Sequence, residues 1–236
     1  MKLRIAVVLT TFMYLSAHAE QQDIPQWGVL LPALSVASDY RFNGMSLSDR
    51  KPVAQVSLHL WRPDGHYAGL WISEVDFLDG ETTLEIDSYI GRDIKHGKFN
   101  SKFELMYSAF NDDQVPGPTY DFIQIKTGTT RSFGATMLSI AGLWSPSGAA
   151  GAGTVSQLRI EGQHQVTQFL KLGGLVGRRW AEQGIDRTYW DIGITLEWKN
   201  WDLDLRYHDT NLATEQCFYT DWCEGGVAAK LTLASY

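Results

Sequence analysis

Apolar and polar residues alternate along short segments that follow one another through this chain of 236 residues, with almost no helical pattern between them. In residues 188–198, Trp190, Ile192 and Ile194 share one phase, whereas Asp191 and Thr195 take the other. Successive side chains of a strand point to opposite faces, so this period of two predicts strands with one apolar and one polar face. The segments are close to the about 9–11 residues that a tilted transmembrane strand needs.

The segments number about twelve, which is an even number, and the connections between them alternate in length. Long loops at one end and short turns at the other are typical of bacterial outer-membrane barrels, and only the short turn at 78–81 departs from that order. The long connections are 43–51, 110–118, 145–153, 181–187 and 209–225, and the short ones are 62–65, 95–98, 128–131, 164–167 and 199–200.

A water-soluble β-sandwich also alternates, so a secreted β protein is the alternative fold. Aromatic residues at strand ends favour the membrane, because barrels carry aromatic girdles at both interfaces. We therefore predict an all-β fold, a transmembrane antiparallel up-and-down β-barrel of about twelve strands. Mixed phases in 119–144 leave those strands unassigned. In the last segment, Lys230 shares the phase of the terminal Tyr236, whereas Val227, Leu231 and Leu233 take the other phase. The girdle aromatics are Trp61, Phe110, Trp144, Trp180, Tyr189, Trp198 and Trp201.

The first 19 residues have the features of a secretory signal peptide: a basic start, an apolar stretch and a small-x-small cleavage site. Cleavage removes Lys2 and Arg4 and no acid, so the formal charge falls from -7 to -9. Such an acidic chain does not suit nucleic acid. We predict a signal peptide at 1–19, a periplasmic segment at 20–31 and a barrel at 32–236, located in the outer membrane among lipid and lipopolysaccharide.

The only two cysteines, Cys217 and Cys223, lie close together in an exported chain, which predicts a local disulfide. A zinc site would need further ligands at regular spacing, and none accompany them. We therefore predict neither a metal site nor a cofactor.

Three stretches carry a resemblance to a known family: SDYRFNGMSLSDRKPVAQ (38–55), HYAGLWISEVDF (66–77) and LEIDSYIGRD (84–93). They combine a serine-aspartate-aromatic strand, a glycine-serine loop, a proline that opens the next strand, and G-x-W-x-S and E-x-D-x-Y-x-G strands. Together they resemble the TorF family of porins, most clearly over residues 35–93. The resemblance implies a small outer-membrane barrel and brings no catalytic residue. Asn43 departs from the pattern, since a basic residue is expected there.

The polar phase of the strands is expected to line the lumen. The main candidates are Asp39, Arg41, Glu74, Asp76, Glu85, Asp87, Lys102, Glu104, Asp191, Glu197, Asp202, Asp204 and Arg206. Together with Asp93, Asp121, Glu161, Arg159 and Lys171, they amount to thirteen acids and five bases. Unpaired carboxylates are costly in a dry interior, so we predict a water-filled channel for small solutes that prefers cations or is unselective. A closed barrel held by ion pairs is the alternative.

Two other classes of function have some support in the sequence. An outer-membrane hydrolase could use Ser57, His59 and Asp39, but residues i and i+2 of a strand stand nearly 7 Å apart and no G-x-S-x-G motif is present. We therefore predict that the chain is not an enzyme. A barrel that binds partners through its loops is the other alternative, because the 209–225 loop carries Phe218, Tyr219 and Trp222.

Overall fold

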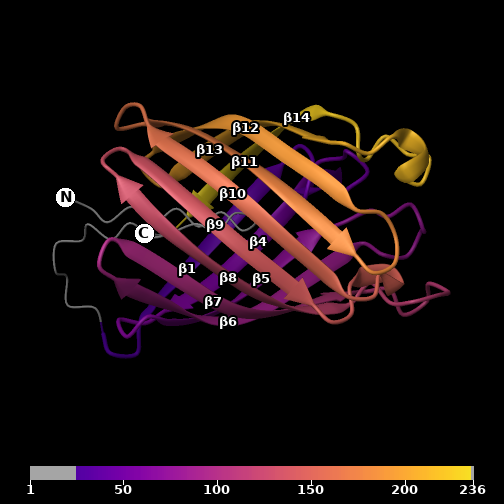
Figure 1. Cartoon of the computed structure of the whole chain (residues 1–236), viewed down its shortest axis with the longest axis horizontal. Coiled ribbons are helices and arrows are strands. Elements are labelled where there is room, and N and C mark those ends of the chain that lie inside the picture. The colour runs from indigo at the N-terminus through magenta and orange to yellow at the C-terminus, as the bar shows by residue number, and fades with distance from the viewer. Residues whose placement is uncertain (1–24, 235–236) are drawn as a thin grey trace.

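The computed structural model describes residues 25–234, and twelve antiparallel strands of this range close into a barrel (Figure 1). Each strand pairs with its sequence neighbour, and β1 pairs with β14, for example Ala33 with Ala234, to complete the ring. The predicted up-and-down barrel is therefore confirmed. The strands are β1 (Val29–Ala37), β4 (Val53–Trp61), β5 (His66–Glu74), β6 (Leu84–His96), β7 (Phe99–Phe110), β8 (Phe122–Phe133), β9 (Thr136–Ser145), β10 (Val155–Gln165), β11 (Leu170–Ala181), β12 (Arg187–Trp198), β13 (Trp201–Thr210) and β14 (Gly226–Ala234).

The first strand begins at Val29, whereas the sequence placed the start of the barrel at residue 32. The signal peptide predicted at 1–19 lies outside the described residues, as does Tyr236. Within residues 25–234, no helix is long and apolar enough to cross a membrane.

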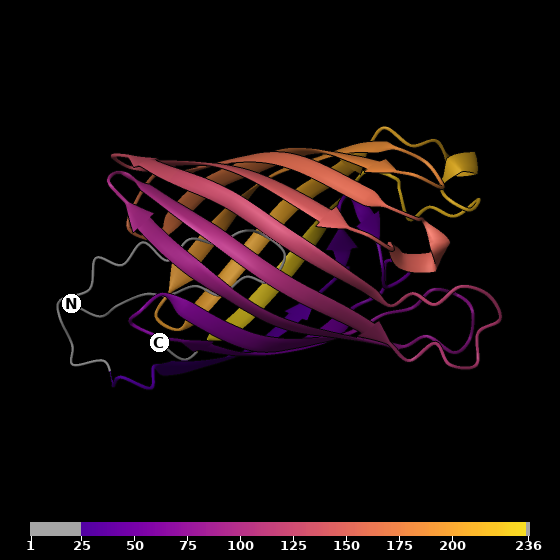
Figure 2. The same ribbon diagram turned by 60° about the horizontal axis from the view of Figure 1, so that its bottom comes forward.

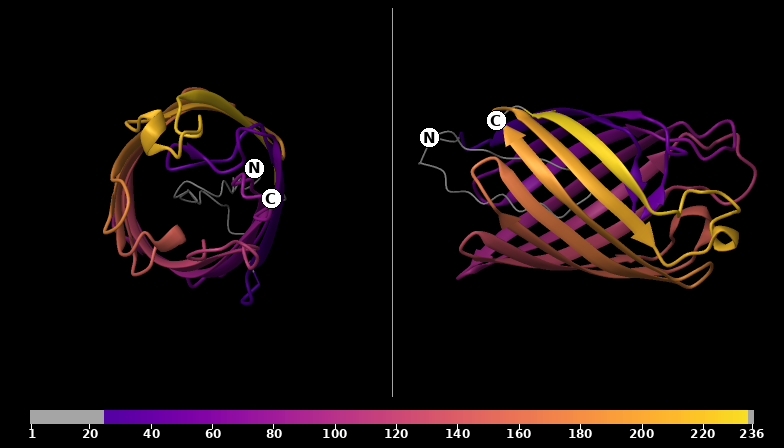
Figure 3. Two further views of the ribbon diagram at one scale, coloured as in Figure 1. Left: turned by 90° about the vertical axis from the view of Figure 1, so that its right-hand side faces the viewer. Right: turned by 90° about the horizontal axis from the view of Figure 1, so that it is seen from above.

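The two ends of the barrel differ (Figure 2). Short turns join the strands at one end, such as the two residues between Trp198 and Trp201, which pair directly. The other end carries the long loops, with the 3-10 turns η1 (Ala149–Gly151) and η2 (Thr214–Gln216) and a separate hairpin of β2 (Arg41–Phe42) and β3 (Met45–Ser46). Seen along the barrel axis, the loops of this end gather over the ring of strands (Figure 3). We call this end the mouth.

The two faces of the wall have opposite chemistry. On β12, Ile192 is 62% exposed on the outer face, whereas its neighbour Asp191 is only 8% exposed on the inner face. The same alternation resolves the segment 119–144, where Gln124 and Ser139 face inward and Ile125 and Ile140 face outward. A water-soluble protein buries its apolar face. Here the apolar face is the one that lies outside.

Four of the seven aromatic residues expected at the girdle lie on the outer face: Trp144 and Trp180 toward the mouth, and Trp198 and Trp201 beside the short turn. The other three, Trp61, Phe110 and Tyr189, belong to the inner face or pack against it. That part of the prediction is wrong. Large side chains are needed to fill the volume that the strands enclose, and these three aromatic rings fill part of it.

Candidate functional site: the lumen and its mouth

The inner face follows from the strand register, because residues paired across strands share a face. Nine predicted lumen residues lie on it: Glu85, Asp87, Lys102, Glu104, Asp191, Glu197, Asp202, Asp204 and Arg206. Asp39 and Arg41 are also inside, but they belong to the loop that follows β1 and not to a strand of the wall.

Three predicted lumen residues are misplaced. Asp121 lies on the outer face, where it accepts a hydrogen bond from the Tyr107 hydroxyl. Glu74 lies on the outer face and accepts a hydrogen bond from the Ala54 N–H at 2.7 Å, and Asp76 pairs with Lys51 at the mouth. The sequence pattern put Trp71 toward lipid, whereas Trp71 is buried in the lumen at 2% exposure. Reading that aromatic residue as lipid-facing inverted the whole of β5.

Five inward bases were missed. Lys126 lies in the segment whose phase was unassigned, and Lys230 was assigned to the phase of the terminal Tyr236. Arg187 was assigned to a loop and Lys95 to a short turn, and Arg179 lies in the polar phase of its strand but was left out of the count. With these bases, the described inner face carries ten acids and ten bases. The acids are Asp39, Glu85, Asp87, Asp93, Glu104, Glu161, Asp191, Glu197, Asp202 and Asp204, and the bases are Arg41, Lys95, Lys102, Lys126, Arg159, Lys171, Arg179, Arg187, Arg206 and Lys230.

Many of these charges are paired across neighbouring strands. The Lys171 ammonium lies 2.5 Å from the Glu197 carboxylate, and Arg206 lies 2.5 Å from Asp191. On the opposite side of the ring, Lys126 lies 3.2 Å from Glu104. The pairing explains how a barrel can hold so many charges on a surface that is largely covered by its own side chains.

Pairing does not satisfy every carboxylate. Buried oxygens of Glu85, Asp87, Glu161 and Asp204 have no hydrogen-bond partner among the described residues. Buried polar groups in proteins are almost always bonded to protein or to ordered water. An uncompensated carboxylate in a dry interior is costly. These oxygens therefore favour a hydrated lumen.

The loop after β1 folds across the mouth. Asn43 and Gly44 have φ values of +50° and +82°, which suit the two-residue turn of the β2–β3 hairpin. A Cβ on Gly44 would lie 2.4 Å from Cγ2 of Thr210 and 3.0 Å from Cβ of Tyr189, so the tip of the hairpin packs against β12 and β13. The hairpin thus reaches over the lumen and narrows the mouth.

The base of this hairpin is held by an ion pair. Arg41 Nε lies 2.5 Å from Asp39, and Ser46 Oγ donates a 2.6 Å hydrogen bond to the same carboxylate. The Arg41 guanidinium also donates 3.0 Å hydrogen bonds to the carbonyls of Trp222 and Glu224. The first loop and the last loop of the barrel are therefore joined through one arginine.

The last loop is itself closed by a disulfide between Cys217 and Cys223. Its Trp222 side chain folds back over the mouth and donates a 2.9 Å hydrogen bond from Nε1 to Asp49. This bond, together with Lys51, lowers the pKa of Asp49 from its usual value. Phe218 and Tyr219 instead point outward, at 72% and 80% exposure. We call the contact between residues 38–51 and 217–224 the mouth clasp.

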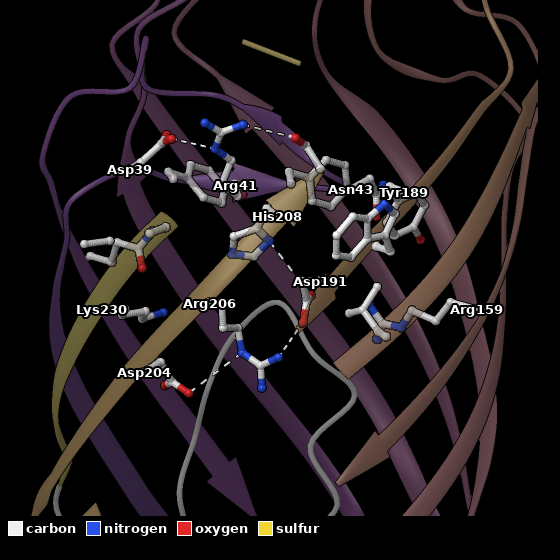
Figure 4. A pocket seen from close by; sticks show the side chains of 18 residues that line it. Asp39, Arg41, Asn43, Arg159, Tyr189, Asp191, Asp204, Arg206, His208 and Lys230 are labelled. Carbon is white, nitrogen blue, oxygen red and sulfur yellow. Dashed lines mark hydrogen bonds and ion pairs between the residues drawn. The ribbon is translucent and has the colours of Figure 1, made fainter. Parts of the chain in front are cut away.

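A cavity of about 90 Å³ lies beneath the hairpin (Figure 4). Asp39, Arg41 and Asn43 form its upper edge, and inward side chains of β10, β12, β13 and β14 form its walls. In the close view, the labelled charged groups converge on one space. The labelled wall residues are Arg159, Tyr189, Asp191, Asp204, Arg206, His208 and Lys230.

Ser57, His59 and Asp39, the candidates for a hydrolase, form no hydrogen bonds with one another in the described residues. His59 Nδ1 hydrogen-bonds with the Tyr89 hydroxyl at 3.1 Å, within a cluster of tyrosine rings. Asp39 is bound to Arg41 and Ser46. Within residues 25–234, no group of three or more His, Cys, Asp or Glu residues is placed to hold a metal ion.

Comparisons with known proteins agree with this architecture. A family described as "Bacterial protein of unknown function (Gcw_chp)" matches residues 29–234, which include every strand of the barrel. The chain belongs to this family. Its description states no function, so the TorF name stays a prediction. No curated protein matches the chain in sequence.

Several solved structures share the fold. The COG4313 outer membrane channel from Pseudomonas putida F1 is 10% identical, with a TM-score of 0.59, over 92% of this chain and 97% of that chain. The KdgM porin is 7% identical with a TM-score of 0.57, and the NanC porin is 6% identical with the same score. Each covers 88% of this chain and 99% of its own. At such low identity, these likenesses show the fold alone.

Proposed function

We propose that this protein is an outer-membrane channel of the porin kind that passes small polar solutes. The observation that carries the proposal is the reversal of the two faces, with apolar side chains outside and paired charges inside. An outward apolar band is what a lipid bilayer stabilises, and a polar interior is what water requires. The fold shared with the porins and the COG4313 channel supports the same conclusion. The proposal places the barrel in the outer membrane after export, in contact with lipid and lipopolysaccharide.

Weak charge selectivity fits the lumen better than cation preference. The acid excess expected from the sequence disappears once Glu74, Asp76 and Asp121 are removed from the inner face and the missed bases are added. A pore selects ions through an imbalance of fixed charge along its wall. The channel is therefore proposed to conduct both signs of ion and to admit neutral solutes.

The size of the solute is limited by the mouth. A twelve-stranded barrel lies between the filled eight-stranded kind and the wide sixteen-stranded porins, and the β2–β3 hairpin narrows it further. One solved structure with this fold is the KdgM porin in complex with disordered oligogalacturonate. That complex supports a polar solute for the present channel, which acts by passage and not by catalysis.

Swelling of proteoliposomes in sugars of increasing size tests the proposal. Ala141 faces inward and Ile140 faces outward on the same strand, which offers a matched pair of substitutions. Wild type and Ile140→Trp should admit a pentose at similar rates, and Ala141→Trp should slow its entry. Liposomes with folded wild-type barrel that swell no faster than empty liposomes would overturn the proposal. Equal rates for the two variants would show that entry does not use the lumen.

A further inference from the structure

The cavity beneath the hairpin contains polar atoms that the channel's own ion pairs leave unused. We propose that it is a binding site for a small hydroxylated carboxylate, a solute with one carboxylate and neighbouring hydroxyl groups. The inference rests on the proposed function, because it names the class of solute that the channel would hold. It is argued from three groups: Lys230, Asp204 and Asn43.

Lys230 supplies the positive charge. It lies on the inner face of β14, directly opposite Asp204 of β13, and lines the cavity. Among the described residues, its ammonium has no hydrogen bond, and no carboxylate lies within 4.0 Å of it. In contrast, Lys171 and Arg206 are each engaged with a carboxylate at 2.5 Å. An ammonium that faces a cavity without a direct partner is a site for a carboxylate of the solute.

Asp204 supplies an acceptor. Its Oδ1 accepts a 2.6 Å hydrogen bond from the Thr195 hydroxyl and lies 3.9 Å from Arg206 Nε, whereas its Oδ2 is buried without a hydrogen-bond partner among the described residues. The whole side chain is about nine-tenths buried, at 6% exposure for the residue. An ionised carboxylate only accepts hydrogen bonds, so its partner must be a donor such as a hydroxyl group.

Asn43 supplies a donor from above. It stands at the tip of the hairpin and lines the cavity, and its Nδ2 is buried without a hydrogen-bond partner in the described range. An amide nitrogen of this kind donates to an oxygen of the solute. Lys230, Asp204 and Asn43 thus offer one cation, one acceptor and one donor, beside the arginines that also line the cavity.

The surrounding charges decide between a hydroxy acid and a simple anion. The remaining carboxylates of the cavity, Asp39 and Asp191, are bound to Arg41 and Arg206, so these guanidinium groups are already engaged. A compact anion without a hydrogen-bond donor, such as sulfate, would meet Lys230 but also the free oxygen of Asp204, which repels it. A solute with a hydroxyl group beside its carboxylate satisfies both. The volume of about 90 Å³ restricts it to a few heavy atoms.

Isothermal titration of the purified, refolded barrel in detergent tests this assignment. Glycerate carries a carboxylate and two hydroxyl groups, propionate carries only the carboxylate, and glycerol carries only hydroxyl groups. Glycerate should bind at least about tenfold more tightly than either, since each lost charged hydrogen bond is worth about that factor. Lys230→Met should weaken glycerate binding at least about tenfold.

Lys102→Met is the matched control. Lys102 is also an inward lysine, but it lies on β7 against Asp93 and outside the cavity, so its loss should change the affinity less than about twofold. Heat-modifiable migration in electrophoresis verifies that each variant is folded. No glycerate binding, equal binding of propionate, or equal losses in the two lysine variants would overturn the assignment. Isothermal titration measures binding and does not depend on conduction. A barrel that conducts ions but does not bind glycerate would disprove only this inference. A barrel that binds glycerate but does not conduct would disprove only the proposed channel.

Discussion

The outer and inner faces of the same strands solve opposite problems. On the outer face, Ile192 and Ile160 stand free at 62% and 52% exposure and need a medium that does not hydrogen-bond. On the inner face, Asp191 and Glu197 are covered and each holds a basic partner. A shift of one residue in the register would move every side chain of a strand to the other face. The order of apolar and polar residues along each strand therefore specifies the fold more strictly than their overall numbers do.

The largest expected effect is a charge on the outer face. Ile194 lies on the outer face of β12 between Leu172 and Leu205, near the middle of its strand. Ile194→Arg should lower the free energy of unfolding in lipid vesicles by about 2–4 kcal/mol. Val227→Arg places the same charge on the outer face near the mouth and should cost about 0–1 kcal/mol. If urea titrations gave the same loss of unfolding free energy for Ile194→Arg and Val227→Arg, the placement of this face in the membrane would be contradicted.

The mouth clasp comes next. The Cys217–Cys223 disulfide closes a short loop, and loss of both sulfurs in the Cys217→Ser, Cys223→Ser variant should destabilise that loop by about 2 kcal/mol. Because Arg41 and Ser46 bind the backbone of Trp222, the hairpin should then leave the mouth more often. Recordings should show larger and noisier single-channel currents than wild type. Tyr219→Ala, which removes an exposed ring of the same loop that does not pack against Trp222, should leave the currents unchanged.

The inner face offers a smaller effect that measures its hydration. Arg206→Met removes the partner of Asp191, whose carboxylate lies 2.5 Å away. In a water-filled lumen, Arg206→Met should lower the free energy of unfolding by about 1 kcal/mol, as the loss of a solvated ion pair does. In a dry, closed barrel it should reach about 3–5 kcal/mol, because an unpaired charge would stay buried. Urea titration of the variant therefore separates the channel from the closed barrel.

The smallest effect is a pH dependence of the mouth clasp. The hydrogen bond from Trp222 and the contact with Lys51 lower the pKa of Asp49 from its usual 3.8. A carboxylate with a lowered folded-state pKa stabilises the folded loop above its unfolded pKa, and this stabilisation is lost as the pH falls through the lowered value. Current noise should thus rise below about pH 4. Asp49→Asn should not show this rise in current noise at low pH. A rise of the same size in that variant would show that another titrating group causes it.

Alternation alone predicted the barrel, its strand number and the inward position of residues such as Asp191 and Asp204, because β12 and β13 keep a strict period of two. It failed on β5, where Trp71 fills the lumen, and on Lys126, whose segment mixed the two phases. It also failed on Lys230, which shares the phase of the terminal Tyr236 in the sequence. The cavity and the mouth clasp were beyond its reach. They depend on contacts such as Arg41 with Trp222, between residues far apart in the chain and in irregular loops.

Single-channel recording in planar bilayers tests the central claim most directly. The refolded wild-type barrel, placed between two concentrations of KCl, should give discrete current steps with a reversal potential close to zero, because its inner face carries equal numbers of acids and bases. Arg206→Met leaves an excess of acid on the inner face and should shift the reversal potential toward cation preference. A folded barrel that gives no current steps would contradict the account.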